Sequence, residues 1–282
     1  MNILRTPLVV STVLTTAERF QHRQVIRETW ANQNNSKNIK NGNVKVYFLL
    51  SNPKNSNIRK KLDEEQELYN DIIITNLTES YHNLYQKVYA AFLFVQAYYP
   101  RTTYHMKVDD DVLIEMDRMF HFLQNNRKSS IMCKVWPKSA PKRNRKHKWF
   151  ISREQWSSNY YPKYCDGPMY MIGHHALKSL TSFSRQMDLF PFEDVFYTGI
   201  IPEAANVTRI SWSDHILHYN TELWWNVSEC DKSKMPLLFA VHSLNTPSKM
   251  RFGYKILRNL TCISHNDLLL KRTEFYEKKK GN

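Results

Sequence analysis

The chain has 282 residues, 42% of them apolar, which suits one large globular domain or two small ones and excludes a disordered protein. Its formal net charge of +14 indicates an anionic partner such as a nucleic acid, an acidic lipid or a phosphorylated small molecule. No stretch reaches the roughly 18 apolar residues of a membrane-spanning helix, and the first apolar run is too short for a signal peptide, so we expect no membrane anchor within this sequence.

The first half of the sequence alternates apolar, strand-like runs with amphipathic segments. The pattern predicts strands at residues 8–12, 44–50, 72–75 and 102–108. It predicts helices at residues 18–31, 57–69 and 80–99, the last one ended by Pro100. This order favours an α/β fold with a mainly parallel central sheet flanked by helices. Ligands of such sheets bind beyond the carboxyl ends of the strands, which places a site just after residue 108.

The second half is less regular. Helices are expected at residues 116–125 and 192–200, and strands at 131–135, 169–172 and 237–241. The densest basic run, residues 138–148, is either a solvated loop or an anion-binding patch. The lysines at 278–280 are expected to form a frayed tail.

Three consecutive aspartates, Asp109, Asp110 and Asp111, follow the strand predicted at 102–108. Adjacent carboxylates repel one another, and apolar neighbours on both sides make that repulsion stronger. A hard divalent cation such as Mg²⁺ or Mn²⁺ would offset it, because these ions take oxygen ligands and keep phosphates in their coordination shell. Strand alternation would put Asp109 and Asp111 on one face and Asp110 on the other. A polar turn that merely closes the strand is the alternative.

Other charged residues suit a metal-bound diphosphate, in which the cation cancels carboxylate and phosphate charge together. Four basic side chains could add to phosphate binding: Arg23, Arg27, Lys87 and Lys107. A second acid pair, Glu193 and Asp194, begins a predicted helix, where the helix dipole favours carboxylates. Taken alone, this pair could be ordinary helix N-terminal charge.

The four cysteines lack the Cys-x-x-Cys spacing of metal ligands, so a zinc site is not expected. Their even number is compatible with two disulfides in an oxidising compartment and equally with four buried thiols. Five Asn-x-Ser/Thr sequons occur where about three would arise by chance. This excess weakly indicates a protein of the secretory pathway. The sequons begin at Asn34, Asn76, Asn206, Asn226 and Asn259.

Seven short motifs together resemble the β-1,3-galactosyltransferase and β-1,3-N-acetylglucosaminyltransferase family, which also includes the fringe-type enzymes. They are residues 23–30 (RQVIRETW), 48–50 (FLL), 79–84 (ESYHNL) with Lys87, 107–112 (KVDDDV), 148–150 (KWF), 161–167 (YPKYCDG) with Tyr170, and 193–199 (EDVFYTG). Each motif alone is weak, but seven in the family order are specific. The resemblance covers roughly residues 8–245.

The resemblance implies a single catalytic domain over residues 1–282, with a core at about 8–245 and a GT-A-type nucleotide-sugar-binding fold. It implies inverting transfer of a hexose, galactose or N-acetylglucosamine, from a UDP-sugar to a glycan of a glycoprotein or glycolipid, with Mn²⁺ as cofactor and a β-1,3 linkage as product. It also implies the Golgi lumen, with membrane association only through an anchor not visible in this chain, and no nucleic-acid partner.

Carried over by position, the resemblance assigns Asp109, Asp111 and His242 to the metal, with Asp111 as the likelier direct ligand, and Asp194 to the general base. His242 could instead be a structural histidine. The nucleotide-sugar would be bound by Arg23, Arg27, Tyr81, Asn83, Lys87, Lys107, Asp109, Asp110 and Gly167. Gly167 would let the backbone approach the sugar closely. Cys133 and Cys165 are the first disulfide pairing to expect, since both flank the proposed sugar site.

The chain also departs from the family pattern. It has Tyr85 where the family commonly has threonine in Asn-Leu-Thr-x-Lys, and Asp166 and Pro168 flank Gly167 where Ser-Gly-Gly or similar is common. The identity of the donor sugar therefore stays open. Two other classes also stay open, a basic metal-dependent nucleic-acid-processing protein and an inactive sugar-binding relative. The first lacks a recognisable nucleic-acid motif, and the intact acids argue against the second.

Overall fold

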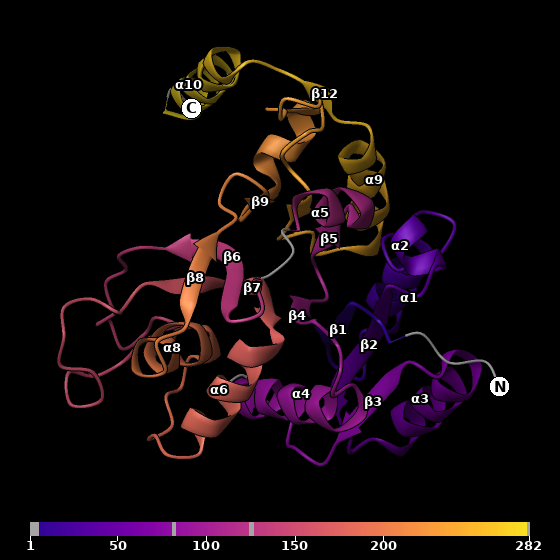
Figure 1. Ribbon diagram of the computed structural model, residues 1–282, viewed down its shortest axis with the longest axis vertical. Helices are drawn as coiled ribbons and strands as arrows, with labels where there is room; N and C mark the ends of the chain where they lie inside the picture. Colours follow the sequence, from indigo (N-terminus) through magenta and orange to yellow (C-terminus); the bar gives the residue numbers. More distant parts are fainter. Residues whose placement is uncertain (1–5, 81–82, 124–126, 281–282) are drawn as a thin grey trace.

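The computed structural model describes residues 6–80, 83–123 and 127–280. At its centre is a seven-stranded sheet with the strand order β3-β2-β1-β4-β7-β6-β8 (Figure 1). Four neighbouring strands are parallel: β1 (Val9–Leu14), β2 (Val44–Ser51), β3 (Ile72–Thr75) and β4 (Tyr104–Asp109). Beyond β4 the sheet is completed by β7 (Tyr164–Gly173), antiparallel to both β4 and β6 (Ser130–Trp136), and by β8 (Thr208–Ser211).

Strand β1 is buried along its whole length, because its sequence VVSTVL is an almost continuous apolar run. It pairs with β2 on one side and β4 on the other, so that Leu14 lies beside both Leu49 and Asp109. The chain extends the sheet from β1 to β3 and then returns to the other side of β1 for β4. The carboxyl ends of β1 and β4 therefore meet at a topological switch point, where open α/β sheets bind their ligands.

Helices cover both faces of the sheet (Figure 1). One face packs against α1 (Phe20–Glu28), α3 (Ser56–Tyr69), α5 (Met116–Phe122) and α9 (Pro247–Arg258). The other packs against α4 (Leu84–Tyr98), α6 (His174–Ser184) and α8 (Ile201–Ala204). Alternation along β1 divides the core, since Val9 and Val13 join the first group and Val10 and Leu14 the second. The prediction of an α/β fold with a mainly parallel sheet between helices is confirmed.

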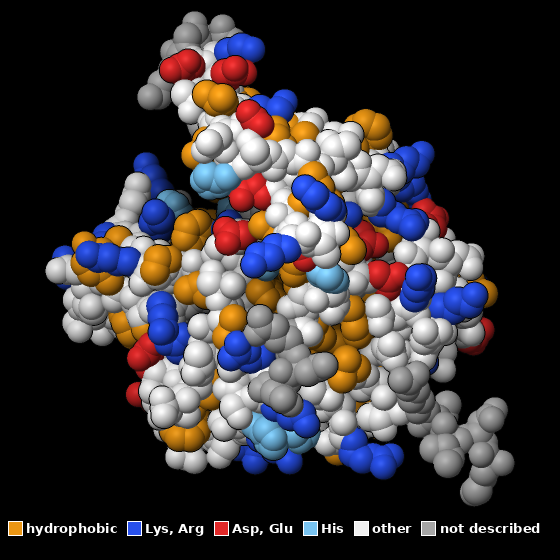
Figure 2. Space-filling view, turned by 45° about the horizontal axis from the view of Figure 1, so that its top comes forward, with side chains coloured by type: hydrophobic (Ala, Val, Ile, Leu, Met, Phe, Trp, Pro, Cys, Tyr) orange, Lys and Arg blue, Asp and Glu red, His pale blue; other side chains and the backbone are white. Residues whose placement is uncertain are grey.

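A long loop, residues 137–163, connects β6 to β7 and extends to the left in Figure 1. It contains the basic run at residues 138–148. Figure 2 shows Lys, Arg and hydrophobic side chains together on this part of the surface. The loop has a defined conformation, with an isolated bridge between Lys142 and Phe150, and it is considered again below.

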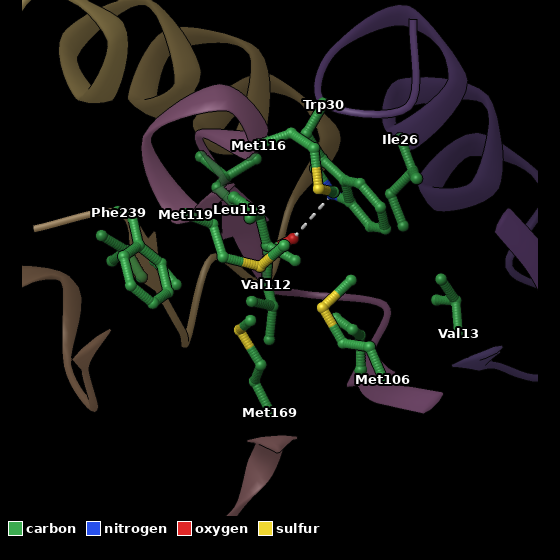
Figure 3. Packing of buried hydrophobic residues seen from close by; sticks show 14 of the residues in the cluster. Val13, Ile26, Trp30, Met106, Val112, Leu113, Met116, Met119, Met169 and Phe239 are labelled. Carbon is green, nitrogen blue, oxygen red and sulfur yellow. Dashed lines mark hydrogen bonds between the residues drawn. The ribbon is translucent and has the colours of Figure 1, made fainter. Parts of the chain in front are cut away.

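One core connects the sheet to the segment that follows β4 (Figure 3). Met106 of β4 and Met169 of β7 lie near Val112, and α5 packs on the opposite side. The indole Nε1 of Trp30 donates a hydrogen bond to the carbonyl oxygen of Val112 at 3.1 Å. The core therefore fixes the backbone directly after the three aspartates.

A second sheet, made of very short strands, lies beside the aspartates. Its order is β5-β11-β9, with β5 (Leu113–Ile114), β11 (Ala240–Val241) and β9 (Ile216–Leu217). Strand β11 is antiparallel to β5 and parallel to β9. The strand predicted at residues 237–241 is confirmed only in its last two residues. His242 and His218 directly follow β11 and β9, so this small sheet brings both histidines to the end of β4.

The predicted helices differ from the observed ones mainly in where they begin and end. The helix predicted at 192–200 is α7 (Glu193–Val195) followed by a π-helix, η2 (Phe196–Ile200). Residues 278–280, expected as a frayed tail, instead belong to α10 (His265–Lys280). The sequence pattern does not predict α6, α8, α9 or α10, nor the short α2 (Lys37–Lys40) and the 3₁₀ helix η3 (Asn220–Trp225). Among the residues described, none of the helices is long and apolar enough to cross a bilayer.

All four cysteines form disulfides. Cys133 and Cys165 join the neighbouring strands β6 and β7, which confirms the first expected pairing. Cys230 and Cys262 join the segment after β10 (Val227–Ser228) to β12 (Thr261–Cys262). Each bridge spans 32 residues of sequence, so both restrict the unfolded chain considerably.

We predict that reduction destabilises the protein. A native disulfide that closes a loop of this length contributes about 2–5 kcal/mol to the free energy of unfolding. Urea unfolding with and without a thiol-free reductant measures the effect, and a Cys230→Ser/Cys262→Ser variant shows how much of it belongs to the second bridge. An unchanged urea midpoint after complete reduction would contradict the prediction.

Candidate functional site

The three aspartates end β4 in a turn. Asp109 is the last residue of the strand, and Asp110 and Asp111 form the turn before β5. Asp109, Asp111 and His242 each offer one ligand atom, and these atoms lie within 4.8 Å of one another. Asp110 is separated from Asp109 and Asp111, as expected. The cause of the separation is the turn, whereas we had assumed the alternation of side chains along a strand.

Asp110 anchors the loop that follows β1. Its Oδ2 accepts hydrogen bonds from Thr15 Oγ1 at 2.5 Å and from Arg19 Nε at 2.6 Å. The Arg19 side chain remains 35% exposed, so its guanidinium also reaches solvent at the edge of the site. None of the sequence motifs includes Arg19. Its position between the first predicted strand and helix, at the same sheet edge as the aspartates, is the signal that could have identified it as a site residue.

His242 faces Asp111 across the small sheet, with its Nε2 3.2 Å from Asp111 Oδ1. This carboxylate oxygen is buried and accepts no hydrogen bond from the residues described. Burial alone would raise the pKa of Asp111, but the neighbouring His242 outweighs it and the pKa lies below its ordinary value. Conversely, Asp111 raises the pKa of His242 against the effect of burial. A buried anionic oxygen that accepts no hydrogen bond and faces only a histidine is a position that a cation would fill.

Asp109 has one cationic partner, Lys107, and two acidic neighbours. Burial, followed by the charges of Asp111 and Glu193, raises the pKa of Asp109 to about 6 even though Lys107 opposes the shift. Its side chain is 35% exposed, so a bound ion could hold further ligands on the solvent side. Two carboxylates and an imidazole are a donor set that hard and borderline divalent cations accept. The residues present therefore fit a divalent cation.

Lys107 connects the cation group to the second acid pair. Its Nζ donates to Asp109 Oδ1 and to the carbonyl oxygen of Gly167, both at 2.6 Å, and lies 3.1 Å from Glu193 Oε1. Glu193 is buried, and its Oε2 accepts a hydrogen bond from Tyr170 at 2.8 Å. Burial would lower the pKa of Lys107, but the two carboxylates outweigh it and raise that pKa. Lys107 thus orients Asp109 and links β4, β7 and α7.

Asp194 stands in the first turn of α7, on the other side of this link. Burial and then the charge of Glu193 raise the pKa of Asp194 to about 7, although the Val195 amide donates to its Oδ1. A Cβ placed on Gly167 would lie 3.4 Å from Asp194 Oδ2, so the glycine keeps the space beside this carboxylate open. A carboxylate that titrates near neutral pH is suited to accept a proton from a hydroxyl group.

Asp166 and His218 form a hydrogen-bonded pair that no sequence motif predicts. The Nδ1 of His218 lies 2.5 Å from Asp166 Oδ2, and Trp136 Nε1 donates to Asp166 Oδ1 at 3.1 Å. The ring centroids of His218 and His242 are 5.5 Å apart. This pair therefore lines the side of the site next to His242. No pattern in the sequence connects residues 166 and 218.

Arg23 and Lys87 have partners within the fold. The Arg23 side chain is fully buried and donates to both oxygens of Glu65 and to the carbonyl oxygens of Thr16 and Ala17. Lys87 Nζ donates to the Thr15 carbonyl and to the carboxylate of Glu79. Both cations hold the loop whose Thr15 hydroxyl binds Asp110. Their contacts show a supporting role, and direct nucleotide binding by either stays a prediction.

The other residues expected to bind the nucleotide have no contact that places them beside the three aspartates. Arg27 pairs with Glu65 and Asp71 on the α1 side of the sheet. Asn83 donates to the Thr78 carbonyl near the start of α4. Tyr81 lies outside the described residues. Nucleotide binding by these three side chains also stays a prediction.

The chain is similar to known glycosyltransferases. Residues 21–213 match a protein family described as Galactosyltransferase. Human β-1,3-galactosyltransferase 1 is 28% identical over 197 residues, which are 69% of this chain and 59% of that protein. Rat lactosylceramide 1,3-N-acetyl-β-D-glucosaminyltransferase is 26% identical over 216 residues, 74% of this chain and 56% of that protein. The matched region thus spans somewhat more than half of these relatives.

Two solved structures are similar over most of the chain. A glycosyltransferase involved in glycosylation of the major capsid of PBCV-1 has a TM-score of 0.47 and 10% identity, with 89% of this chain and 100% of that chain covered. The galactosyltransferase LgtC, in complex with donor and acceptor sugar analogues, has a TM-score of 0.47 and 9% identity, with 92% and 98% covered.

Proposed function

Because this chain belongs to the galactosyltransferase family, we propose that it transfers a hexose, galactose or N-acetylglucosamine, from a UDP-sugar to a glycan acceptor with a β-1,3 linkage. The observation that carries the proposal is the arrangement at the switch point. A group suited to a cation, Asp109, Asp111 and His242, lies on one side of Lys107, and a carboxylate with a near-neutral pKa, Asp194, lies on the other. Inverting sugar transfer from a nucleotide donor uses a base for the acceptor hydroxyl and positive charge for the leaving diphosphate, and these two groups would supply them.

The cation group would hold Mn²⁺, which would neutralise the diphosphate of the leaving UDP. Lys107 fixes the orientation of Asp109 through its bonds to Gly167 and Glu193. Asp110 and Arg19 hold the β1–α1 loop at the same edge. In this GT-A-type fold, these residues would position the UDP-sugar beyond the carboxyl ends of β1 and β4.

Asp194 would act as the general base. It accepts the proton of the acceptor hydroxyl while the hydroxyl oxygen forms a bond to the anomeric carbon and the bond from that carbon to the UDP oxygen breaks. A single displacement of this kind converts an α-linked donor into a β-linked product. Gly167 puts no side chain against Asp194, which would leave this carboxylate accessible to the acceptor hydroxyl.

We also propose residence in the Golgi lumen, as in the resembling family. Both disulfides support an oxidising compartment, because such bonds are rare in the cytosol. All five sequon asparagines are exposed, so the fold would not block their glycosylation. Deglycosylation of the protein expressed in a secretory host tests this proposal, and a mass unaffected by a glycan-removing enzyme would count against it.

Acceptor-dependent UDP release tests the proposed reaction. Purified protein is incubated with UDP-galactose, UDP-N-acetylglucosamine and other UDP-sugars, with Mn²⁺ or with a chelator, and with a set of glycan acceptors. We expect one of the two named donors to release UDP fastest, only with metal and only with an acceptor. If no donor releases UDP above the level of heat-inactivated protein, the proposed activity is wrong.

We predict that the transfer rate falls as the pH decreases through 7. Asp194 must be deprotonated to act as a base, and burial with the charge of Glu193 raises its pKa to about 7. The rate at pH 6 should therefore be about tenfold below that at pH 8. Saturating Mn²⁺ is needed in the assay, because the pKa of Asp109 is also raised, to about 6.

Glu193→Gln provides the internal check on this pH profile. The amide removes one negative charge beside Asp194, so the acidic limb should shift to lower pH. It keeps an oxygen for the Tyr170 hydroxyl and gives up the ion pair with Lys107, so the position of the limb is compared and not the absolute rate. Glu67→Gln, an exposed change on α3, is the matched control and should leave the limb in place. An acidic limb that does not move in Glu193→Gln would show that another group controls the profile.

A further inference from the structure

The loop at residues 137–163 contains a large part of the positive charge of the protein. It has eight Lys or Arg residues and one acidic residue, Glu154, so it contributes about half of the net charge of +14. Seven of the basic side chains are exposed: Lys138, Lys142, Arg145, Lys146, Lys148, Arg153 and Lys163. They gather on the left of the surface shown in Figure 2. The remaining one, Arg143, has a different role.

Arg143 holds the loop in its conformation. Its two terminal nitrogens donate to four carbonyl oxygens between 2.7 and 3.0 Å away. The acceptors belong to Ile151, Ser152, Trp156 and Ser158. The exposed basic side chains therefore project from an internally bonded structure, and their relative positions are largely fixed before any partner binds.

The loop packs on the segment that carries Asp194. Trp156 and Tyr161 contact the ring of Phe190, with centroids 5.5 and 5.9 Å apart, and Phe190 contacts Phe192 directly before α7. At the other end of this segment, a Cβ on Gly199 would lie 3.3 Å from Pro162 Cγ of the loop. The basic loop is thus attached on the side of Asp194, where the acceptor would enter.

Three neighbouring charges of the loop have no counter-charge in the protein. Lys142, Arg145 and Lys146 are exposed and form no ion pair with any residue the structure describes. Like charges this close repel one another, and a bound anion would relieve the repulsion.

The loop also exposes 46% of Trp149 and of Tyr160. Lys148 and Lys138 lie over these rings, with Nζ 5.9 and 4.1 Å from the centroids, so each ring combines a cation with an exposed aromatic surface on which a sugar ring could stack.

We propose that the loop at residues 137–163 binds an acidic acceptor glycan, one that carries sulfate or carboxylate groups, and presents its hydroxyl to Asp194. This inference rests on the proposed function and names the class of acceptor. A glycan fits better than an anionic membrane surface because the charges are combined with exposed aromatic rings and are attached to the segment of the base. The negative groups would lie along the basic side chains, with a neutral sugar ring at the site.

The test uses two acceptor disaccharides that differ only by one sulfate, and the variant Lys142→Gln/Arg145→Gln/Lys146→Gln. The matched control is Lys54→Gln/Lys60→Gln/Lys61→Gln, three exposed lysines in and just before α3 at the other end of the sheet (Figure 1). Binding of each disaccharide is measured directly by titration, and KM is measured by transfer. Both are repeated at high salt and beside vesicles of anionic phospholipid.

We expect the unmodified protein to bind the sulfated disaccharide roughly tenfold more tightly than the neutral one, with a preference that high salt reduces. The loop variant should lose this preference and keep its affinity for UDP and its rate with saturating neutral acceptor. The control variant should behave like the unmodified protein. Equal binding of the two disaccharides by the unmodified protein would overturn the proposal.

The remaining outcomes separate this inference from the proposed activity. Preferential binding of the sulfated disaccharide without transfer of any sugar would support the glycan-binding role of the loop and contradict the transferase function. Loss of UDP affinity in the loop variant would assign the charges to the donor and overturn the acceptor proposal. Tighter binding to anionic vesicles than to the sulfated disaccharide would overturn it in favour of a membrane surface.

Discussion

Asp194→Asn should transfer sugar about 10²- to 10⁴-fold more slowly than the unmodified protein, the usual effect of removing a general base. Asparagine keeps the size of the side chain and cannot accept the proton. The affinities for UDP and Mn²⁺ should change little, because Asp194 is separated from the cation group by Lys107 and Gly167. The expected result is therefore a large loss in kcat with nearly normal donor binding.

Single-turnover transfer and UDP titration together make this measurement. Asp188→Asn is the matched control, because it makes the same change at an exposed position six residues earlier and should leave both quantities unchanged. If Asp194→Asn keeps more than about a tenth of the transfer rate, the base lies elsewhere. Glu193 would then be the next carboxylate to test, although its bonds to Lys107 and Tyr170 already occupy both of its oxygens.

Asp111→Asn should lose both metal-dependent UDP binding and transfer. Replacing even an outer partner of a metal ligand typically lowers metal affinity about 10- to 100-fold, so a direct ligand should cost at least that much. The structural reason is the buried Oδ1 of Asp111, which faces His242 and accepts no hydrogen bond from the described residues. Removing its charge also leaves His242 without the neighbour that raises its pKa.

UDP is titrated with and without Mn²⁺ into the unmodified protein and into Asp111→Asn. The adjacent Asp110→Asn serves for comparison. Asp110 accepts hydrogen bonds from Thr15 and Arg19, so it should not be a metal ligand. Asp110→Asn is expected to keep metal-dependent binding while it loosens the β1–α1 loop. Equal UDP affinity with metal, without metal and in Asp111→Asn would defeat the metal assignment.

Much of the sheet was predictable because its central strands are continuous buried runs. β1 is buried over its whole length and mostly apolar, and β3 was predicted with its correct ends, residues 72–75. The strands β5 and β9 contain two residues each, which is too short for any periodicity to reveal, and β11 is only the end of the strand predicted at 237–241. Their pairing depends on tertiary contacts, and so does the π-helix that follows Asp194.

The residues of the candidate site also include some that the sequence could predict and others that it could not. Asp109 and Asp111 could be singled out because acids in apolar surroundings are conspicuous in a sequence, whereas Asp194 was assigned through the family resemblance. The roles of Arg23 and Lys87 could not, because they depend on Glu65 and Glu79, whose positions only the fold determines. Likewise, His218 gains its place from the pairing of β9 with β11.

The cation group unites two distant parts of the chain. Asp111 and His242 are roughly 130 residues apart, and His242 lies beyond the segment that matches the family. Contacts between residues so distant in sequence close late in folding, because a long loop must first be ordered. A growing polypeptide with this ligand set cannot assemble the group until β11 has been synthesised and has paired with β5. On the proposed assignment, metal capture has to wait for this pairing, and a chain synthesised only as far as the three aspartates would not yet hold a UDP-sugar through them.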